Sequence, residues 1–188
     1  MADAVLDLCG AGALDNLSTG QCARGGLYKV FYGKFSELDL VGTTFNATTK
    51  EVTAIAMTGM ATMYEAVVDK ESARYDFSLQ NGVYYQNDVI FNINGKGLAN
   101  WSVINNMKGL CGDLFFVVYG ADCGGRVVGI SRNTEDDAFI QSWDAVQLAE
   151  HLDTSGNLTE RARDELTFRC KDDHSPLYTS VAIGSIPL

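Results

Sequence analysis

Apolar and polar residues alternate along two neighbouring stretches, residues 73–80 and 85–94. A period of two is typical of a strand with one buried face, and the Asn81-Gly82 pair between the stretches is typical of a tight turn. We therefore expect a hairpin in a sheet that has one water-facing side. The expected buried face carries Ala73, Tyr75, Phe77, Leu79, Tyr85, Val89, Phe91 and Ile93.

Shorter apolar runs, separated by glycine, predict the other strands. The run from Leu114 to Tyr119 has no polar residue except its final tyrosine, and it predicts a buried strand. Residues 41–50 are rich in Thr and turn formers, which predicts a connection or the tip of an extended hairpin. Residues 178–183 fit a strand or a strap. Further strands are expected at residues 27–32, 51–57, 61–68, 126–131 and 165–170, the last with Leu166, Phe168 and Cys170 inward.

Helical spacing of apolar residues occurs in two places. It predicts a flanking helix over residues 97–108, with Gly109 at the position of a C-terminal cap. It also predicts a short second helix over residues 143–152, for which Ser142 is a suitable N-cap. The polar stretch 133–165 around this second helix indicates an insertion or an outer loop.

Length and composition fit one globular domain. The chain has 188 residues, of which 46% are hydrophobic and 20% charged, and it has no apolar stretch near the roughly 20 residues of a membrane helix. Residues 1–26 are rich in Gly and Ala and weakly patterned, so we expect an N-terminal arm. Residues 27–188 are expected to form a single, mainly β (α+β) domain. Residues 1–10 lack the features of a signal peptide, which favours synthesis in a cytoplasm.

The charge balance is acidic. Lys and Arg total 14 against 24 Asp and Glu, which gives a formal net charge of −10. Such a surface is unsuited to gripping nucleic acid, although an acidic protein could still enclose DNA without binding it. Alternatively, the negative charge serves only to keep the protein soluble.

The chain has five cysteines, which is an odd number, and no two of them form a CxxC pair. A zinc site would have to combine Cys170 and His174 with Cys111 and Cys123, which is not the usual paired spacing. Free, mostly buried thiols in a reducing compartment are the favoured interpretation. The five are Cys9, Cys22, Cys111, Cys123 and Cys170.

Catalytic motifs are not found. Residues 129–133 lack the final glycine of a nucleophile elbow, and residues 94–97 do not complete a phosphate-binding loop. A calcium loop that starts at Asp153 would place Leu158 at the required glycine and Asp164 at the required glutamate. We expect the acidic pairs Asp136-Asp137 and Asp172-Asp173 to lie in solvated loops. His151 and His174 lie in polar stretches of the sequence. The aromatic residues Tyr84, Tyr85 and Phe91 have no basic neighbours, which a platform for stacking on nucleic acid would need.

The sequence therefore predicts no catalytic, cofactor or metal site. A small hydrolase or a ligand-binding β domain remains an alternative, and it would need a pocket that gathers Asp172, Asp173 and His174 with another polar group.

Several short motifs follow one another in a recognisable order between residues 20 and 182. They are Cys22, Gly25-Gly26-Leu27-Tyr28-Lys29-Val30, Val52-Thr53-Ala54-Ile55, Tyr75-Asp76-Phe77, Phe91-Asn92-Ile93 and Glu165-Leu166-Thr167-Phe168, with Pro176 after them. This order resembles a family of virion proteins, related to tail-tube and tail-ring proteins, from tailed phages of Bacteroidetes hosts such as the crAss-like phages. The chain departs from the family pattern at Cys123 and in the longer stretch from Thr134 to Arg163, which leaves room for an outer decoration or a neck adaptor.

The resemblance implies a tail-tube-like β-sandwich flanked by a helix and assembled into hexameric or dodecameric rings. The water-facing sheet would line a channel that encloses DNA, and the arm and loops would contact neighbouring rings or other tail and neck proteins. The location would be the virion, after assembly in the host cytoplasm, with no membrane contact. Such proteins carry no catalytic residues. A capsid decoration protein or a head–tail adaptor is the alternative.

Overall fold

The structure is a computed structural model, and it describes residues 26–49, 51–68, 73–94, 102, 104–105, 113–120, 124–133, 138–142, 144–154, 163–174 and 177–188. The strands are β1 (Leu27–Lys34), β2 (Thr44–Asn46), β3 (Glu51–Ala54), β4 (Tyr64–Ala66), β5 (Arg74–Gln80), β6 (Tyr84–Asn94), β7 (Leu114–Gly120), β8 (Gly125–Val128), β9 (Ile130–Arg132), β10 (Phe139–Gln141), β11 (Asp144–Thr154), β12 (Arg163–Asp172) and β13 (Leu177–Thr179). Two 3-10 turns are η1 (Phe35–Glu37) and η2 (Ile183–Ser185).

Eleven of these strands form one sheet, and β9 pairs with β10 separately. The path runs β2-β3-β13-β8-β7-β11-β12-β6-β5, with β1 paired to β7 and β4 paired to β1. All pairs are antiparallel except β13 with β3. The mainly β class expected from the sequence is confirmed.

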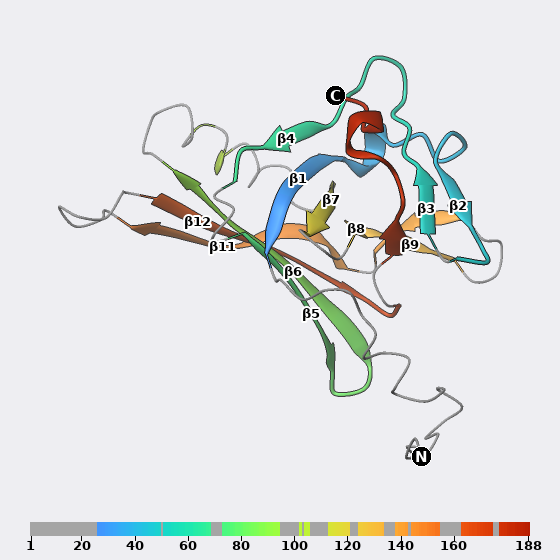
Figure 1. The fold of residues 1–188 in the computed structure, drawn as a ribbon. Helices are drawn as coiled ribbons and strands as arrows, with labels where there is room; N and C mark the ends of the chain where they lie inside the picture. Colours follow the sequence, from blue (N-terminus) through green and yellow to red (C-terminus); the bar gives the residue numbers. More distant parts are fainter. Residues whose placement is uncertain are drawn as a thin grey trace, which may run out of the picture.

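The sheet consists of two layers that meet at one narrow junction (Figure 1). Between β7 and β11 the only register pair is Leu114 with Val146. On one side lie β4, β1, β7, β8, β13, β3 and β2, and on the other β11, β12, β6 and β5. The first hydrophobic cluster lies between the layers, because it combines residues of β1 and β7 with residues of β6 and β12.

Strand β7 is buried on both faces, which explains its apolar run. Leu114, Phe116 and Val118 belong to the cluster between the layers. Phe115, Val117 and Tyr119 belong to a second cluster on the opposite face of the same strand, which also contains residues of β3, β8 and the C-terminal segment. A strand that is buried on both faces does not need to alternate apolar and polar residues. The prediction of a buried strand is confirmed.

The expected β5–β6 hairpin is confirmed, with Asn81 and Gly82 both at positive φ in its turn. Its burial changes along its length. Ala73, directly before β5, is buried and Tyr75 is partly buried, whereas Phe77 and Leu79 are each 54% exposed. The reason is that the hairpin extends beyond the body of the molecule, so its far half has no second layer to pack on (Figure 1).

Several other expected elements are present. Residues 41–50 contain β2 and the turn that leads to β3, so this stretch is a hairpin tip. Residues 178–183 include most of β13. Leu166, Phe168 and Cys170 of β12 point into the first cluster as expected.

The helix expected over residues 143–152 is wrong, because residues 144–152, the described part of this stretch, belong to β11. Two irregularities in the pairing with β12 explain the error. Asp144 and Gln147 are three residues apart where their partners are two apart, and the register shifts again between Leu148 and Glu150. Each bulge inserts a residue into the strand. The bulges interrupt the period of two by which a strand is recognised. The apolar residues at helical spacing do not share one buried face, since Leu152 is 50% exposed.

The other expected helix, over residues 97–108, falls mostly outside the described residues. Ser102, Ile104 and Asn105 are described there with helical backbone, and the described residues contain no helix of seven or more residues, so they do not show a flanking helix. None of the helical segments described is long and apolar enough to cross a membrane.

Candidate functional site

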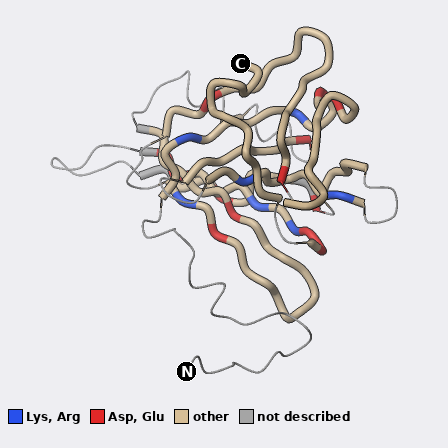
Figure 2. The backbone as a smooth tube through the Cα atoms, turned by 45° about the vertical axis from the view of Figure 1, so that its right-hand side comes forward, with Lys and Arg blue, Asp and Glu red and all other residues tan. Residues whose placement is uncertain are grey.

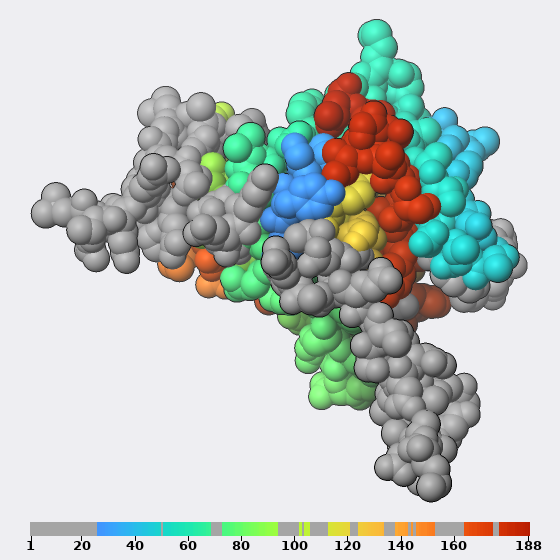
Figure 3. Space-filling model, viewed as in Figure 1, coloured from blue at the N-terminus to red at the C-terminus, as the bar shows by residue number. Residues whose placement is uncertain are grey.

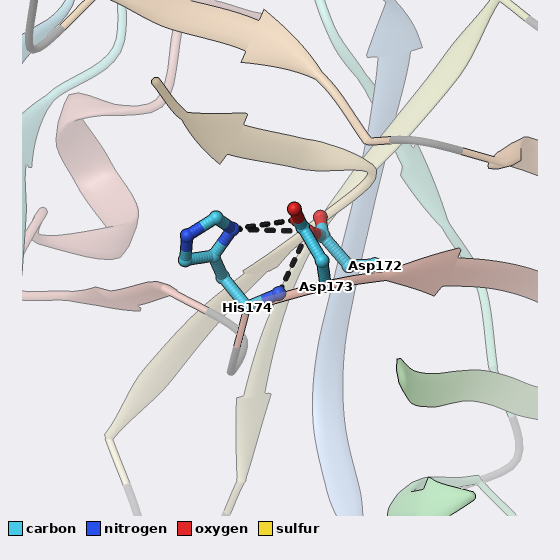
Figure 4. Close-up of side chains that lie close together, drawn as sticks. All are labelled: Asp172, Asp173 and His174. Carbon is cyan, nitrogen blue, oxygen red and sulfur yellow. Dashed lines mark hydrogen bonds and ion pairs between the residues drawn. The ribbon is translucent and has the colours of Figure 1, made fainter. Parts of the chain in front are cut away.

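Asp172, Asp173 and His174 lie together at the end of β12 (Figure 4). Their candidate ligand atoms all lie within 4.8 Å of one another, and no other such group is found in the described part of the chain. His174 Nδ1 is 2.6 Å from Asp173 Oδ1 and 3.8 Å from Asp172 Oδ1. The structure thus gathers the three residues that the hydrolase alternative required.

Asp172 differs from the solvated carboxylate expected from the sequence, because it is only 5% exposed. It continues the inward row of Phe168 and Cys170 on β12. Its Oδ1 accepts hydrogen bonds from Ser131 Oγ at 3.1 Å and from the backbone N–H of His174 at 3.1 Å, and Ser142 also bonds to it. Asp172 therefore connects β12 to β9 and to the segment before β11.

The two neighbouring carboxyls have opposite pKa shifts. Burial raises the pKa of Asp172, and a hydrogen bond to Asp173 raises it further. Burial acts in the raising direction on Asp173 too, but hydrogen bonds with Asp172 and His174 hold its pKa below the usual value. The pair therefore favours a proton on the buried carboxyl, shared with the exposed one.

These contacts account for the cluster as a structural feature. Carboxylate and imidazole atoms can hold a metal ion, but Asp172 already accepts hydrogen bonds from several partners. Asp173 and His174 have side chains that are 67% and 44% exposed. Adjacent carboxyl and imidazole groups at a surface do not by themselves make a catalytic site, which also needs a nucleophile or substrate position beside them.

The second histidine lies elsewhere. His151 Nε2 is 3.0 Å from Asp164 Oδ1, across the β11–β12 pair. His151 is opposite Leu166, whereas His174 follows the end of β12, which puts the two histidines about 20 Å or more apart along the strand. Asp153 is opposite Asp164 in the same strand pair, so the stretch considered as a calcium loop connects two strands.

Cys170 is 1% exposed, and burial raises the pKa of its thiol to about 12. It is a free cysteine, as expected, and a buried, protonated thiol is a poor zinc ligand. Cys9, Cys22, Cys111, Cys123 and the acidic pair Asp136-Asp137 lie outside the described residues, as do residues 95–97 of the loop that resembled a phosphate site.

The outer face of the layer formed by β11, β12, β6 and β5 is a second candidate surface. Here we call it the outer polar face. The alternation of β5 and β6 places their polar residues on it, and the pairing with β12 and β11 continues it. Its described charged residues are Arg74, Asp76, Asp88, Asp144, Glu150, Glu165, Arg169 and Lys171.

The described cations of the outer polar face are paired with carboxylates. Arg169 Nε and Nη2 donate to the two carboxylate oxygens of Asp88 at 2.8 and 2.9 Å. Arg74 Nε is 3.2 Å from Asp76, and Lys171 Nζ is 3.4 Å from Asp144. The sequence predicted this polar face on β5 and β6. It could not predict the partner Arg169, which is 81 residues from Asp88.

Asn92 is an exception within this face. Its side chain is 1% exposed, and neither its Oδ1 nor its Nδ2 has a hydrogen-bond partner among the described residues. A buried amide without partners costs stability.

Comparisons with known proteins identify no relative. No family model, no curated protein and no solved structure matches the chain.

Proposed function

We propose that this chain is a structural subunit of a bacteriophage tail, which assembles with copies of itself into rings that form the tube or neck channel for DNA. The tail-tube-like β-sandwich expected from the order of motifs is part of this proposal. The phage and tail assignments rest on that resemblance. The two-layered, mainly β arrangement is compatible with it.

The observation that carries the proposal is the pairing of cations on the outer polar face. A surface that binds DNA presents unpaired Lys and Arg to phosphates. Here three cations, Arg74, Arg169 and Lys171, each have a carboxylate partner on the same face. The described charges there are three positive and five negative, so a polyanion is repelled rather than held. A channel lining for moving DNA needs this property.

The proposal includes the absence of catalysis. Asp172, the buried member of the one acidic cluster described, is engaged by Ser131, Ser142 and the backbone of His174. A structural role explains its burial without a substrate. If the chain is a hydrolase instead, His174→Ala should abolish an activity that wild-type protein shows.

Negative-stain electron microscopy of the purified full-length chain tests the proposal. Rings or stacked tubes with a central opening are the expected result, and a species that stays monomeric at every concentration would contradict it. Counting copies per virion then separates two ring roles, because a tube subunit is present in many stacked rings and an adaptor in one. Portal, terminase or tail genes beside this gene would support the phage assignment.

A further inference from the structure

The far end of the β5–β6 hairpin is uncharged and exposes several apolar side chains. No Asp, Glu, Lys or Arg occurs from residue 77 to residue 87, although 20% of the chain is charged. In Figure 2 the end of this hairpin is free of blue and red. Phe77 and Leu79 are each 54% exposed, and Val83 in the turn is 69% exposed. Interface cores are depleted in charge and enriched in aromatic residues, and this hairpin end has both features.

Strand β5 also ends the sheet. Among the described residues it pairs with β6 on one side only, and none of the backbone hydrogen bonds described involves its outer edge. It has seven residues, whereas β2 and β4, the other strands at the ends of the sheet, have three each. A long open edge is a template for another extended strand. The end of the hairpin projects beyond the other described strands in Figure 3, and none of those strands lies along this edge of β5.

Residues 1–25 precede the described part of the chain, and the described part begins beside β5. The backbone N–H of Leu27 donates to the carbonyl oxygen of Ala73 at 2.8 Å, directly before β5. Residues 4–8 read Ala-Val-Leu-Asp-Leu. In an extended chain Leu6 and Leu8 share one face and Asp7 points the other way, which is the same alternation as Phe77, Ser78 and Leu79.

The connecting length is sufficient to reach another copy. Residues 8–27 span up to about 60 Å when extended, which exceeds the roughly 30 Å diameter of a small domain. A head-to-tail contact of this kind can close a ring, because each subunit donates at one side and accepts at the other. Pairing of β5 with β5 of a second copy would be two-fold symmetric and would stop at a dimer.

We infer that residues 4–8 of one copy add as a strand to the open edge of β5 in a neighbouring copy, with Leu6 and Leu8 packed against Phe77 and Leu79. This inference rests on the proposed function, since its partner is a second copy of the chain. It specifies which surfaces join the subunits.

Three full-length variants test it by sedimentation velocity. The donor variant carries Leu6→Asp and Leu8→Asp, and the acceptor variant carries Phe77→Asp, with Leu79→Asp as a second acceptor variant. The control is Met60→Asp, because Met60 is 98% exposed in the loop between β3 and β4, which lies at the other end of the molecule from the hairpin (Figure 1). Thermal unfolding by circular dichroism checks that each variant is folded.

The donor and acceptor variants should each raise the apparent dissociation constant of assembly by about tenfold or more, because each removes buried apolar contacts and introduces a charge. The control should assemble as wild type does. A mixture of donor and acceptor variants should form heterodimers, since the first keeps an intact β5 edge and the second keeps intact residues 4–8.

Other outcomes separate the inference from the proposed function. Rings that survive in both variants would overturn the inference and leave the proposed function standing. Loss of assembly in the acceptor variant alone would show that something else, such as a second β5, pairs with this edge. Failure of the mixture to associate would show that residues 4–8 act within their own chain. Wild-type protein that never associates would contradict both.

Discussion

Asp172 is a buried carboxyl that joins three segments of the chain. Ser131 and Ser142 are 4% and 5% exposed, and both bond to it. Replacing Asp172 with Ala leaves these hydroxyls and the backbone N–H of His174 without their acceptor. We expect the free energy of unfolding to fall by about 1–3 kcal/mol, as measured by chemical denaturation. Asp173→Ala, at an exposed position, is the matched control and should have a much smaller effect.

The raised pKa of Asp172 also predicts a dependence on pH. The folded state binds this proton more tightly than the unfolded state, so wild-type stability falls as the pH rises from the ordinary value of 3.8 through the raised pKa. Asp172→Asn has no such charge. Its free energy of unfolding relative to wild type should therefore increase as the pH rises from 3.8 through the raised pKa of Asp172. A difference that stays constant with pH would contradict the raised pKa.

Cys170 should be chemically inert in the folded protein. Burial raises the pKa of its thiol to about 12, and the thiolate is the reactive form. We expect iodoacetamide to modify Cys170 only after unfolding, as peptide mapping by mass spectrometry would show. Modification of Cys170 under native conditions, at a rate near that of a free thiol, would contradict the buried position.

The sequence pattern correctly predicted which residues are buried where a strand has one face packed against a single hydrophobic cluster. Leu166, Phe168 and Cys170 were correctly placed inward on β12. Asp172, the next residue of the same row, was expected to be solvated like its neighbour Asp173. The pattern of one strand cannot reveal that Ser131 and Ser142, from distant segments, supply hydrogen bonds to a buried carboxyl.

Among the elements, the junction of β8 and β9 depends on Gly129. Its φ is +93°, a conformation that favours glycine. A Cβ at this position would lie 2.5 Å from Val146 Cγ2 and 3.0 Å from the carbonyl oxygen of Leu114. Leu114 and Val146 form the junction between the two layers. Gly129 therefore allows β7, β8 and β11 to meet.

Gly129→Ala should lower the free energy of unfolding by at least about 2 kcal/mol, because backbone strain and overpacking add. Gly184→Ala is the control, since a Cβ there meets nothing within 4 Å. Guanidinium unfolding of both variants measures the difference. Equal stability of the two variants would contradict the close packing at the junction.

The type of an element could be predicted where its pattern of apolar and polar residues is regular. Where the pattern is irregular, it indicated the wrong type. The β5–β6 hairpin follows from its alternation and its Asn81-Gly82 turn, and β7 follows from its continuous apolar run. Strand β11 was mistaken for a helix because two bulges alter its spacing. These bulges arise in the pairing with β12, about which the sequence of β11 alone carries no information.

At the scale of the whole molecule, the order of the strands in the sheet could not be predicted from the sequence. The path brings β13 beside β3, with Tyr178 opposite Glu51, and such distant pairings leave no local pattern. The water-facing side of the sheet was predictable for β5 and β6. Its continuation over β12 and β11, where Arg169 and Lys171 meet their carboxylate partners, was not.

Net charge and the uncharged hairpin together predict how assembly responds to salt. Each subunit carries a formal charge of −10, so subunits brought together in a ring repel one another, and added salt screens this repulsion. The proposed contact through Phe77 and Leu79 contains no ion pair that salt would weaken. Raising the salt concentration from about 0.01 M to about 0.15 M should therefore favour assembly, with a larger sedimentation coefficient at equal protein concentration. Dissociation on adding salt would instead indicate that ion pairs hold the subunits together, and the contact would then have to lie on a charged surface, away from residues 77–87.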